Sequence, residues 1–217
     1  MQKFSPFVNP FGSGATAALI MLSALLAGCA SSGGQPTSTY DFGPVPALQQ
    51  AAKPHPLPAI IVADVSGPAS LDTERMHYRL LYADARQSRP YAYNQWTSTP
   101  LQLLTQRIKA RIAQSGVKVL SATDAAASIT LLRIEVDDFA QNFDSATQSS
   151  GQIGLRASVF HGHKLVDQQT FTRSSPAPTP DAAGGARALA DSSDALAGDI
   201  LAWLAALPIQ KDPSAHE

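Results

Sequence analysis

The amino-acid sequence predicts an α+β fold in which two amphipathic helices pack on one face of a largely antiparallel sheet. Two segments repeat apolar residues at helical spacing, several shorter segments have the alternation or β-branched composition of strands, and the order along the chain is strands, helix, strands, helix. Two amphipathic helices bury their apolar sides most simply against one face of a sheet. The other face, or an edge, is then left to contact something else.

The first strands are expected before residue 97. Tyr40–Pro44 is a short strand-like piece that ends at Gly-Pro, and Ala59–Val65 is a largely apolar run of β-branched character. A run of the second kind is typical of a central strand that is covered on both faces. Met76–Tyr82 and Pro90–Asn94 are two further strand candidates, which the polar stretch 83–89 joins. We therefore expect a hairpin in this region.

The first helix is expected to begin after Thr99. Thr99 is suited to be the N-cap, Pro100 takes the first helical position, and Gln102 completes a Thr-x-x-Gln capping box. One side of the helix is apolar through Leu101, Leu104, Ile108 and Ile112. The polar residues that lie elsewhere on its surface are Gln106, Arg107, Lys109 and Arg111. Gly116 is expected to end this helix.

An antiparallel meander is expected in the next part of the chain. Val117–Leu120 reads as a short strand, and Ser128–Val136 as a longer apolar one. Gly151–Phe160 alternates apolar and polar residues, and Leu165–Arg173 is its return strand after the tight connection 161–164. Consecutive strands that are joined in this way pair as neighbours.

The second helix is expected from Asp181 to Pro208, after a loop that contains three prolines. Alanine and leucine dominate the segment. One side carries Leu189, Leu196, Ile200, Trp203, Leu204 and Leu207. The last residues, 209–217, are expected to form a disordered tail.

The amino terminus has the pattern of a lipoprotein signal peptide. Lys3 is followed by an apolar segment and then by Leu26-Ala27-Gly28-Cys29, which contains the only cysteine. This is the charged region, apolar region and small-residue cleavage site of a secretory signal. A transmembrane helix is the first alternative, but the apolar run is shorter than the roughly 20 residues that a bilayer core requires. The second alternative is an ordinary secreted protein whose cysteine is incidental.

The chain is accordingly divided into a signal peptide (1–28), a lipidated flexible tether (29–39), a single α+β domain (40–208) and the tail. Lipidation of Cys29 adds enough acyl chain for stable membrane attachment. It also leaves no thiol for a disulfide, a thiolate metal site or a cysteine nucleophile. Because Ala30 rather than aspartate follows the cysteine, the default sorting rule in a Gram-negative host predicts the outer membrane.

Composition excludes some classes of partner. The chain has 44% hydrophobic and 15% charged residues and a formal net charge of −1. Nothing in that balance favours nucleic acid or an anionic membrane surface as a partner for the chain as a whole. The polar tether is too poor in apolar residues to fold alone.

No cluster of residues supports catalysis, a metal or a cofactor. His161 and His163 stand two apart, but a glycine separates them and no third ligand is near, which favours a solvated turn. Glu135, Asp137 and Asp138 lack the six to eight oxygens of a calcium site and are interpreted as charges of an edge strand. A Ser-His-Asp set has no Gly-x-Ser-x-Gly elbow to support it.

Several short motifs, in their order and spacing, resemble the ABC-type transport auxiliary lipoproteins. These are the Cys29 lipobox with its tether, Tyr40–Pro44, Met76–Arg79, Tyr91–Trp96 leading into the first helix, Phe139–Phe143, and the closing helix with Trp203. That family includes the paraquat-inducible C lipoprotein and accompanies MCE-protein lipid transport systems. The resemblance covers nearly the whole mature chain. Its recurring Trp96 is expected in the core and Arg79 as a paired polar residue of the sheet.

The resemblance implies a non-enzymatic, periplasm-facing contact component that is anchored in the outer membrane. Its implied partners are an MCE protein and an ABC permease and ATPase, with phospholipid or a similar hydrophobic molecule as cargo and a homo-oligomer left open. One alternative is a lipid-binding carrier, which predicts an apolar groove between sheet and helices. Another is an anchored hydrolase, which requires a Ser/His/Asp cluster around His77, His161 or His163.

Overall fold

The computed structural model describes residues 35–47, 57–121, 123 and 129–208. The chain divides into two compact units, Met1–Pro36 and Thr37–Glu217, and the second contains the helices and strands described below. The predicted signal peptide, Cys29 and the predicted tail 209–217 lie outside the described residues. None of the described helices is long and apolar enough to cross a membrane.

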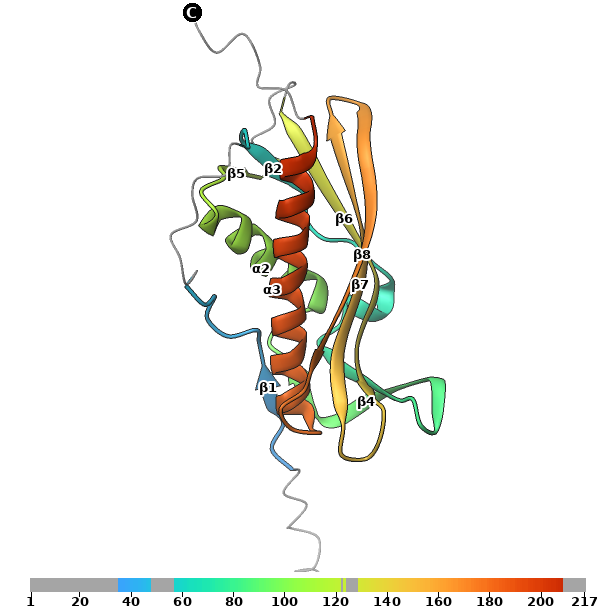
Figure 1. Ribbon diagram of the computed structural model, residues 1–217. Coiled ribbons are helices and arrows are strands. Elements are labelled where there is room, and N and C mark those ends of the chain that lie inside the picture. Colours follow the sequence, from blue (N-terminus) through green and yellow to red (C-terminus); the bar gives the residue numbers. More distant parts are fainter. Residues whose placement is uncertain (1–34, 48–56, 122, 124–128, 209–217) are drawn as a thin grey trace, which may run out of the picture. The chain divides into compact units, whose positions relative to one another are not determined.

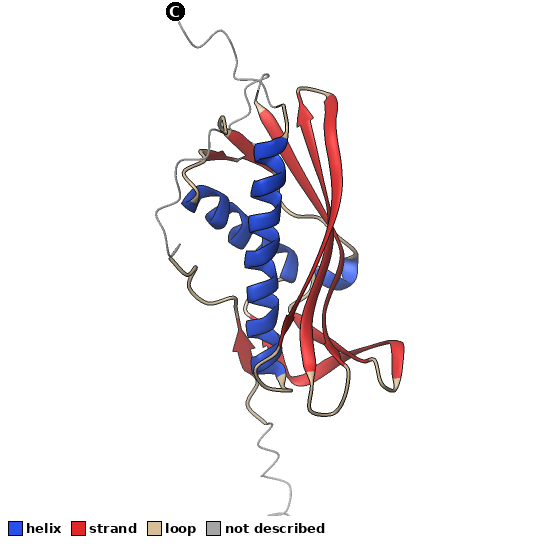
Figure 2. Cartoon of the chain, viewed as in Figure 1, coloured by secondary structure: helices blue, strands red, loops and turns tan. Residues whose placement is uncertain are grey.

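The second unit has the α+β fold that the sequence predicts (Figures 1 and 2). Its described strands form one eight-stranded sheet. The strands are β1 (Ser38–Tyr40), β2 (Ile60–Val62), β3 (Arg75–Leu80), β4 (Asp84–Trp96), β5 (Val119–Leu120), β6 (Thr130–Phe143), β7 (Ser149–His161) and β8 (Lys164–Pro176). The helices are α2 (Pro100–Gln114), α3 (Ala182–Ala206) and the short 3-10 helix η2 (Ala69–Leu71).

The long strands pair antiparallel, as expected. β6, β7 and β8 form a meander along their whole lengths, and β3 and β4 form a hairpin. The parallel pairings are short: β1 beside β4, β2 between β5 and β6, and β3 beside the end of β6. β6 therefore has β7 on one side and both β2 and β3 on the other.

Of the strands that are longer than their sequence patterns indicate, β4 and β6 extend furthest. β4 begins at Asp84, so most of the polar stretch 83–89 is strand rather than connection. β6 continues past the predicted end at Val136 to Phe143, across a register shift between Val136 and Asp138. In both cases backbone pairing with a neighbouring strand extends the strand through residues whose side chains carry no clear alternation.

The interpretation of the acidic residues of β6 as edge-strand charges is wrong, because β6 is a central strand. The charges of Glu135 and Asp138 are instead matched by arginines on neighbouring strands. Glu135 pairs with Arg156 of β7, and an Asp138 oxygen lies 2.8 Å from Nη1 of Arg79. Arg79 is thus the paired polar residue of the sheet that the sequence predicts.

The ends of α2 are those predicted. The hydroxyl oxygen of Thr99 accepts a hydrogen bond from the Gln102 backbone N–H at 3.3 Å, and Pro100 is the first helical residue. Gly116, at φ 88°, follows the helix in the left-handed conformation that glycine adopts without strain. α3 begins similarly, because the Asp181 side chain accepts from the Gly184 N–H at 2.8 Å.

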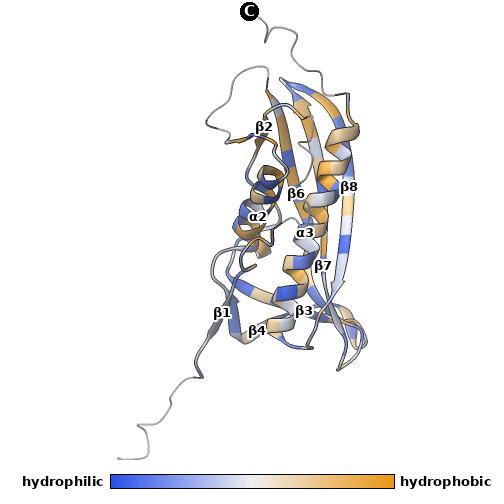
Figure 3. Cartoon of the chain, turned by 60° about the vertical axis from the view of Figure 1, so that its left-hand side comes forward, coloured by the Kyte–Doolittle hydropathy of each residue, from blue (hydrophilic) through white to orange (hydrophobic). Residues whose placement is uncertain are grey.

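Both helices lie on one face of the sheet, in front of the hydrophobic residues of β6 and β7 (Figure 3). α3 packs over β7 and β8 and against α2. The layer between them is filled by fully buried side chains, among them Leu104, Ile108, Val136, Leu155, Leu196 and Ile200. Leu103 is buried and Leu101 only half-buried, so the buried side of α2 is turned slightly from the predicted one.

Replacing Thr99 with alanine will lower the free energy of unfolding by about 1 kcal/mol, because the Gln102 N–H loses its acceptor. Thr97→Ala is the matched control, since Thr97 is exposed and only its backbone N–H is engaged, with the Tyr40 carbonyl. Urea unfolding followed by circular dichroism measures both variants. Equal midpoints for the two would show that the cap contributes nothing.

Candidate functional site

An aromatic contact binds residues 38–46, which we call the entering segment, into the core of the domain. β1 starts at Ser38, so the last two residues of the predicted tether 29–39 belong to the sheet and pair with β4. Phe42 follows, is 8% exposed, and meets Trp96 edge to face with ring centroids 5.7 Å apart. Trp96 is 1% exposed, which confirms its expected place in the core. The chain that leads from the amino terminus is therefore fixed to the domain at Phe42.

A turn at Gly43 directs this segment across the two helices. Gly43 has φ +66°, and its N–H donates to the Asp41 side chain at 2.7 Å. That conformation is disfavoured for residues with a Cβ, which accounts for a glycine here. The turn presents the Gly43 carbonyl to Nη1 of Arg107, at 3.0 Å. α2 thus binds the segment through its backbone.

Arg107 and Arg111 of α2 join the segment to α3 through one carboxylate, Asp194. Nε and Nη2 of Arg107 donate to the two Asp194 oxygens at 2.6 and 2.9 Å, and Nε of Arg111 donates to the first oxygen at 2.7 Å. Arg111 also donates to the Pro46 carbonyl at 3.0 Å. These three side chains, the Arg107–Arg111–Asp194 cluster, connect both helices and the entering segment.

The cluster is mostly buried, and its charges compensate one another. The Arg107 side chain is 5% exposed and that of Asp194 is 14% exposed. Burial alone would raise the pKa of Asp194, but hydrogen bonds from Arg111 and Arg107 outweigh it and hold this pKa below its usual value. The same carboxylate raises the pKa of Arg111. The expectation that Arg107 lies away from the buried side of α2 is wrong.

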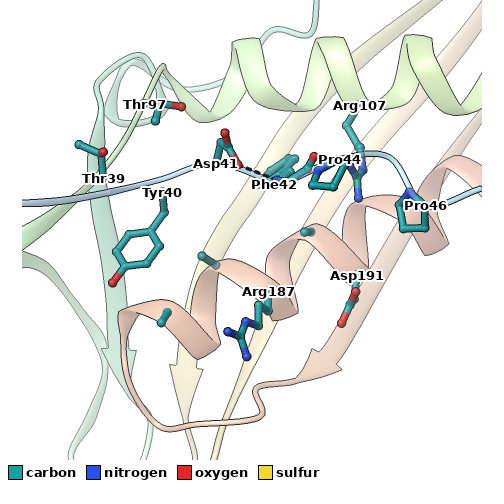
Figure 4. Close-up of a pocket in the computed structure, with 14 residues that line it drawn as sticks. Thr39, Tyr40, Asp41, Phe42, Pro44, Pro46, Thr97, Arg107, Arg187 and Asp191 are labelled. Carbon is teal, nitrogen blue, oxygen red and sulfur yellow. Dashed lines mark hydrogen bonds between the residues drawn. The ribbon is translucent and has the colours of Figure 1, made fainter.

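A cavity of about 490 Å³ lies beside this cluster, between the entering segment and α3 (Figure 4). Small side chains of α3, namely Ala183, Ala186 and Ala190, line it together with Tyr40, Phe42, Pro44 and Pro46. Arg187 and Asp191, one helical turn apart, also line it, and neither forms an ion pair within the described ranges. The cavity therefore combines an apolar lining with one free charge of each sign. It suits an apolar segment with a polar end.

The histidines singled out in the sequence lie apart from this cavity. His161 and His163 are exposed at the β7–β8 turn, where Gly162 has φ 59°. Within the described residues no group of three His, Cys, Asp or Glu side chains is placed to hold a metal. His77 lines a cavity of about 70 Å³ with Ser88 and Asp138, but no hydrogen bond joins these three in the part of the chain described.

The apolar groove expected of a lipid carrier does not lie between sheet and helices, where the described side chains fill the space. Trp203 of α3 closes one end of that layer. Its Nε1 donates to Asp167 of β8 at 2.9 Å, and its ring meets Phe171 edge to face. The cavity beside Tyr40–Pro44 is at a different place, on the outside of the helices.

The Arg107–Arg111–Asp194 cluster is the part of this site that the sequence analysis missed. Two arginines four residues apart on α2 share one side of the helix, and Asp194 stands among alanine, leucine and serine in α3. The signal is one acidic residue near the apolar side of one helix and two basic residues near the apolar side of the other. Such a pattern is typical of an ion pair between two packed helices. These residues indicate an ion pair only once α2 and α3 are known to lie side by side.

Two solved structures have the same fold as this chain. A crystal structure of a Xanthomonas campestris protein is similar with a TM-score of 0.66 and 20% identity, over 77% of this chain and 95% of that one. A second solved structure, of an uncharacterized protein, has a TM-score of 0.58 and 15% identity, over 78% and 99%. These likenesses show a shared fold. None of the curated proteins matches the chain.

The family model for the ABC-type transport auxiliary lipoprotein component matches residues 40–201. That range runs from the entering segment through the whole meander and most of α3. The chain therefore belongs to the family of ABC-type transport auxiliary lipoprotein components.

Proposed function

We propose that the protein is an outer-membrane-anchored auxiliary lipoprotein of an ABC-type system that moves lipid between the membranes through an MCE protein. In this role it acts without catalysis, as the periplasmic contact at the outer membrane. The observation that carries the proposal is the family match over residues 40–201. The sequence Leu26-Ala27-Gly28-Cys29, with Ala30 after it, supports the lipid anchor and its destination.

The structure supports a contact role because the entering segment is bound so firmly. A contact component has to keep a defined orientation to its membrane while a partner engages it. Phe42 in the core and the bond from Arg107 to the Gly43 carbonyl fix the segment that leads from the predicted anchor. The adjoining cavity, with Arg187 and Asp191, is accessible to an apolar segment of a partner.

The second candidate function is binding of a lipid by the domain itself. The observation that favours it is the apolar lining of the same cavity, with Arg187 available to a phosphate. Organic extraction of the purified mature protein, followed by mass spectrometry, distinguishes the two candidates. A stoichiometric phospholipid in the extract supports the carrier, and a lipid-free extract supports the contact role.

Cys29→Ala will keep the protein out of the outer membrane, because the acyl chains that provide attachment are lost and cleavage before residue 29 requires the lipidated cysteine. Labelled palmitate will enter the wild type and not the variant, and fractionation will place the variant outside the outer-membrane fraction. Ser31→Ala is the neighbouring control and keeps both properties. Recovery of Cys29→Ala in the outer-membrane fraction at the wild-type level would contradict the proposed anchor.

The transport role is tested in cells from which the chain is deleted. Phospholipid passage between the two membranes is followed with a labelled precursor, and the deletion is complemented by wild type or by Cys29→Ala at equal abundance. We expect the wild type to restore passage and Cys29→Ala not to. Unchanged passage in the deletion strain, under conditions in which the transport system is expressed, would count against the proposal.

A further inference from the structure

The turn of the β3–β4 hairpin exposes apolar side chains on a projecting element. Residues 81–88, which form the turn and the first part of β4, are all exposed. Leu81 is 38% and Tyr82 is 54% exposed, and both are large hydrophobic side chains. Figure 1 shows the hairpin projecting from the body of the sheet. We refer to Leu81, Tyr82 and Ala83 as the hairpin tip.

Arginines lie along the β3–β4 hairpin. The hairpin, residues 75–96, contains Arg75, Arg79, Arg86 and Arg89 and a single acidic residue, Asp84. Arg79 is paired with Asp138, whereas the other three have no ion pair within the described ranges. In a chain with a net charge of −1, the hairpin is therefore a local region of positive charge. An exposed leucine and tyrosine beside arginines that form no ion pair is the composition of an element that contacts a lipid surface.

The strand order places the tip at the end of the unit where the chain enters. β3 runs parallel to β6 and ends with Leu80 beside Phe143, and β4 leads back from the tip. β1 lies parallel to β4, with Ser38 beside Asn94, so the amino end of β1 is the end nearer the tip. β1, β3 and β4 lie together in Figures 1 and 3, away from β2.

We propose that the hairpin tip docks on the membrane that holds the lipid anchor, with Leu81 and Tyr82 in the headgroup region and Arg86 and Arg89 against anionic phospholipid. The proposal rests on the proposed lipidation of Cys29. The nine residues from Cys29 to Ser38 span about 30 Å when extended, because each residue adds about 3.3–3.6 Å. The anchor and the tip can therefore reach one membrane surface together, which restrains the domain's orientation.

The opposite end of the unit provides a matched control. The β7–β8 turn also has basic and exposed apolar residues nearby, namely Lys164 and, at 47% and 37% exposure, Leu165 and Val166. It lies beside Thr130, at the other end of β6. A 14-residue strand separates the two ends by roughly 40 Å at about 3.3 Å per residue. A membrane that lies across the tip's end of the sheet therefore does not reach this turn.

Site-specific fluorescence quenching tests the proposal on the lipidated mature protein. Because Cys29 is the only cysteine and carries the lipid, Tyr82→Cys and His163→Cys each supply one reactive thiol. Each labelled protein is reconstituted into vesicles of phosphatidylethanolamine and phosphatidylglycerol that contain spin-labelled lipid. We expect quenching at position 82 and none at position 163. Arg86→Gln and Arg89→Gln should each lower the ratio of membrane-docked to undocked hairpin by roughly fivefold.

The outcomes are separable from those of the proposed function. If labelled palmitate is not incorporated, the proposed lipidation of Cys29 is wrong. If the protein is lipidated and retained by vesicles but position 82 is not quenched, or position 163 is quenched instead, membrane docking of the tip is overturned. Quenching at 82 that does not depend on phosphatidylglycerol or on salt overturns the role of the arginines. Protection of position 82 only after envelope proteins are added would make the partner a protein and overturn the proposal.

Discussion

Replacing Asp194 with alanine is expected to lower the free energy of unfolding by about 3–5 kcal/mol. The carboxylate is the only acidic partner of two arginines in the described structure, and Arg107 is 5% exposed. Without Asp194 a guanidinium is left buried with no opposite charge, which costs far more than an exposed ion pair is worth. The variant would also release α2 from α3 beside the entering segment.

The matched control for this substitution is Asp191→Ala, one turn earlier on α3. Asp191 is exposed and forms no ion pair within the described ranges, so its removal should change the free energy of unfolding by less than about 0.5 kcal/mol. A double variant, Arg107→Met with Asp194→Leu, should recover part of the loss, because the more deeply buried guanidinium is removed together with its partner and only Arg111, at 13% exposure, is left unpaired. Equal unfolding midpoints for Asp194→Ala and Asp191→Ala would contradict this account of the cluster.

The lowered pKa of Asp194 also gives the cluster a pH dependence. Hydrogen bonds from Arg111 and Arg107 hold this pKa below its unfolded value against the effect of burial. A carboxyl whose folded pKa is depressed stabilises the fold above its unfolded pKa of about 3.9, and that contribution is lost as the pH falls through the folded pKa. Acid unfolding of the wild type should thus be steep below about pH 4, and less steep in Asp194→Ala.

Gly151→Ala is the second substitution from which we expect a large effect, a loss of about 3 kcal/mol in the free energy of unfolding. A Cβ at this position of β7 would lie 2.5 Å from the Leu189 backbone nitrogen and 2.7 Å from the Ala188 carbonyl carbon. Both atoms belong to the backbone of α3, so no rotamer change relieves the overlap. The helix would have to move away from the sheet at Ala188 and Leu189.

A second glycine on the same strand is the control for Gly151. Gly154→Ala would place its Cβ no closer than 3.7 Å to any neighbour, which is ordinary van der Waals contact. We expect this variant to unfold within about 0.5 kcal/mol of the wild type in the same denaturant titration. The hydroxyl of Ser192 also donates to the Gly151 carbonyl at 2.7 Å, so displacement of α3 breaks that bond too. A Gly151→Ala protein as stable as Gly154→Ala would show that α3 is not held this close.

The elements that the sequence predicts well are those whose signals are local. The N-cap at Thr99 and the glycine at Gly116 act within one helical turn, and the structure confirms both ends of α2. The alternation of Gly151–Phe160 and the turn at Gly162 act on neighbouring residues, and the β7–β8 pairing follows them. Fold class follows from these elements and their order.

The features that the sequence does not predict depend on contacts between distant segments. Arg107 is buried because Asp194, 87 residues away, meets it. The acidic residues of β6 lie in a central strand because β2 and β3 pair with it in parallel, across long connections with no alternation signal. The cavity depends on three separate segments, Tyr40–Pro46, α2 and α3. Spacing along one element carries no information on any of these.

Crosslinking in intact cells identifies the proteins that this lipoprotein contacts and so tests its proposed role in lipid transport. A photoreactive amino acid at Arg187, on the lining of the cavity, is compared with one at Gln168 on exposed β8. After irradiation and purification under denaturing conditions, we predict that an MCE protein is crosslinked at position 187. Much less of it should be crosslinked at position 168. Efficient capture of other envelope proteins at position 187, with no MCE protein or ABC transport subunit among them, would contradict the proposed role in lipid transport.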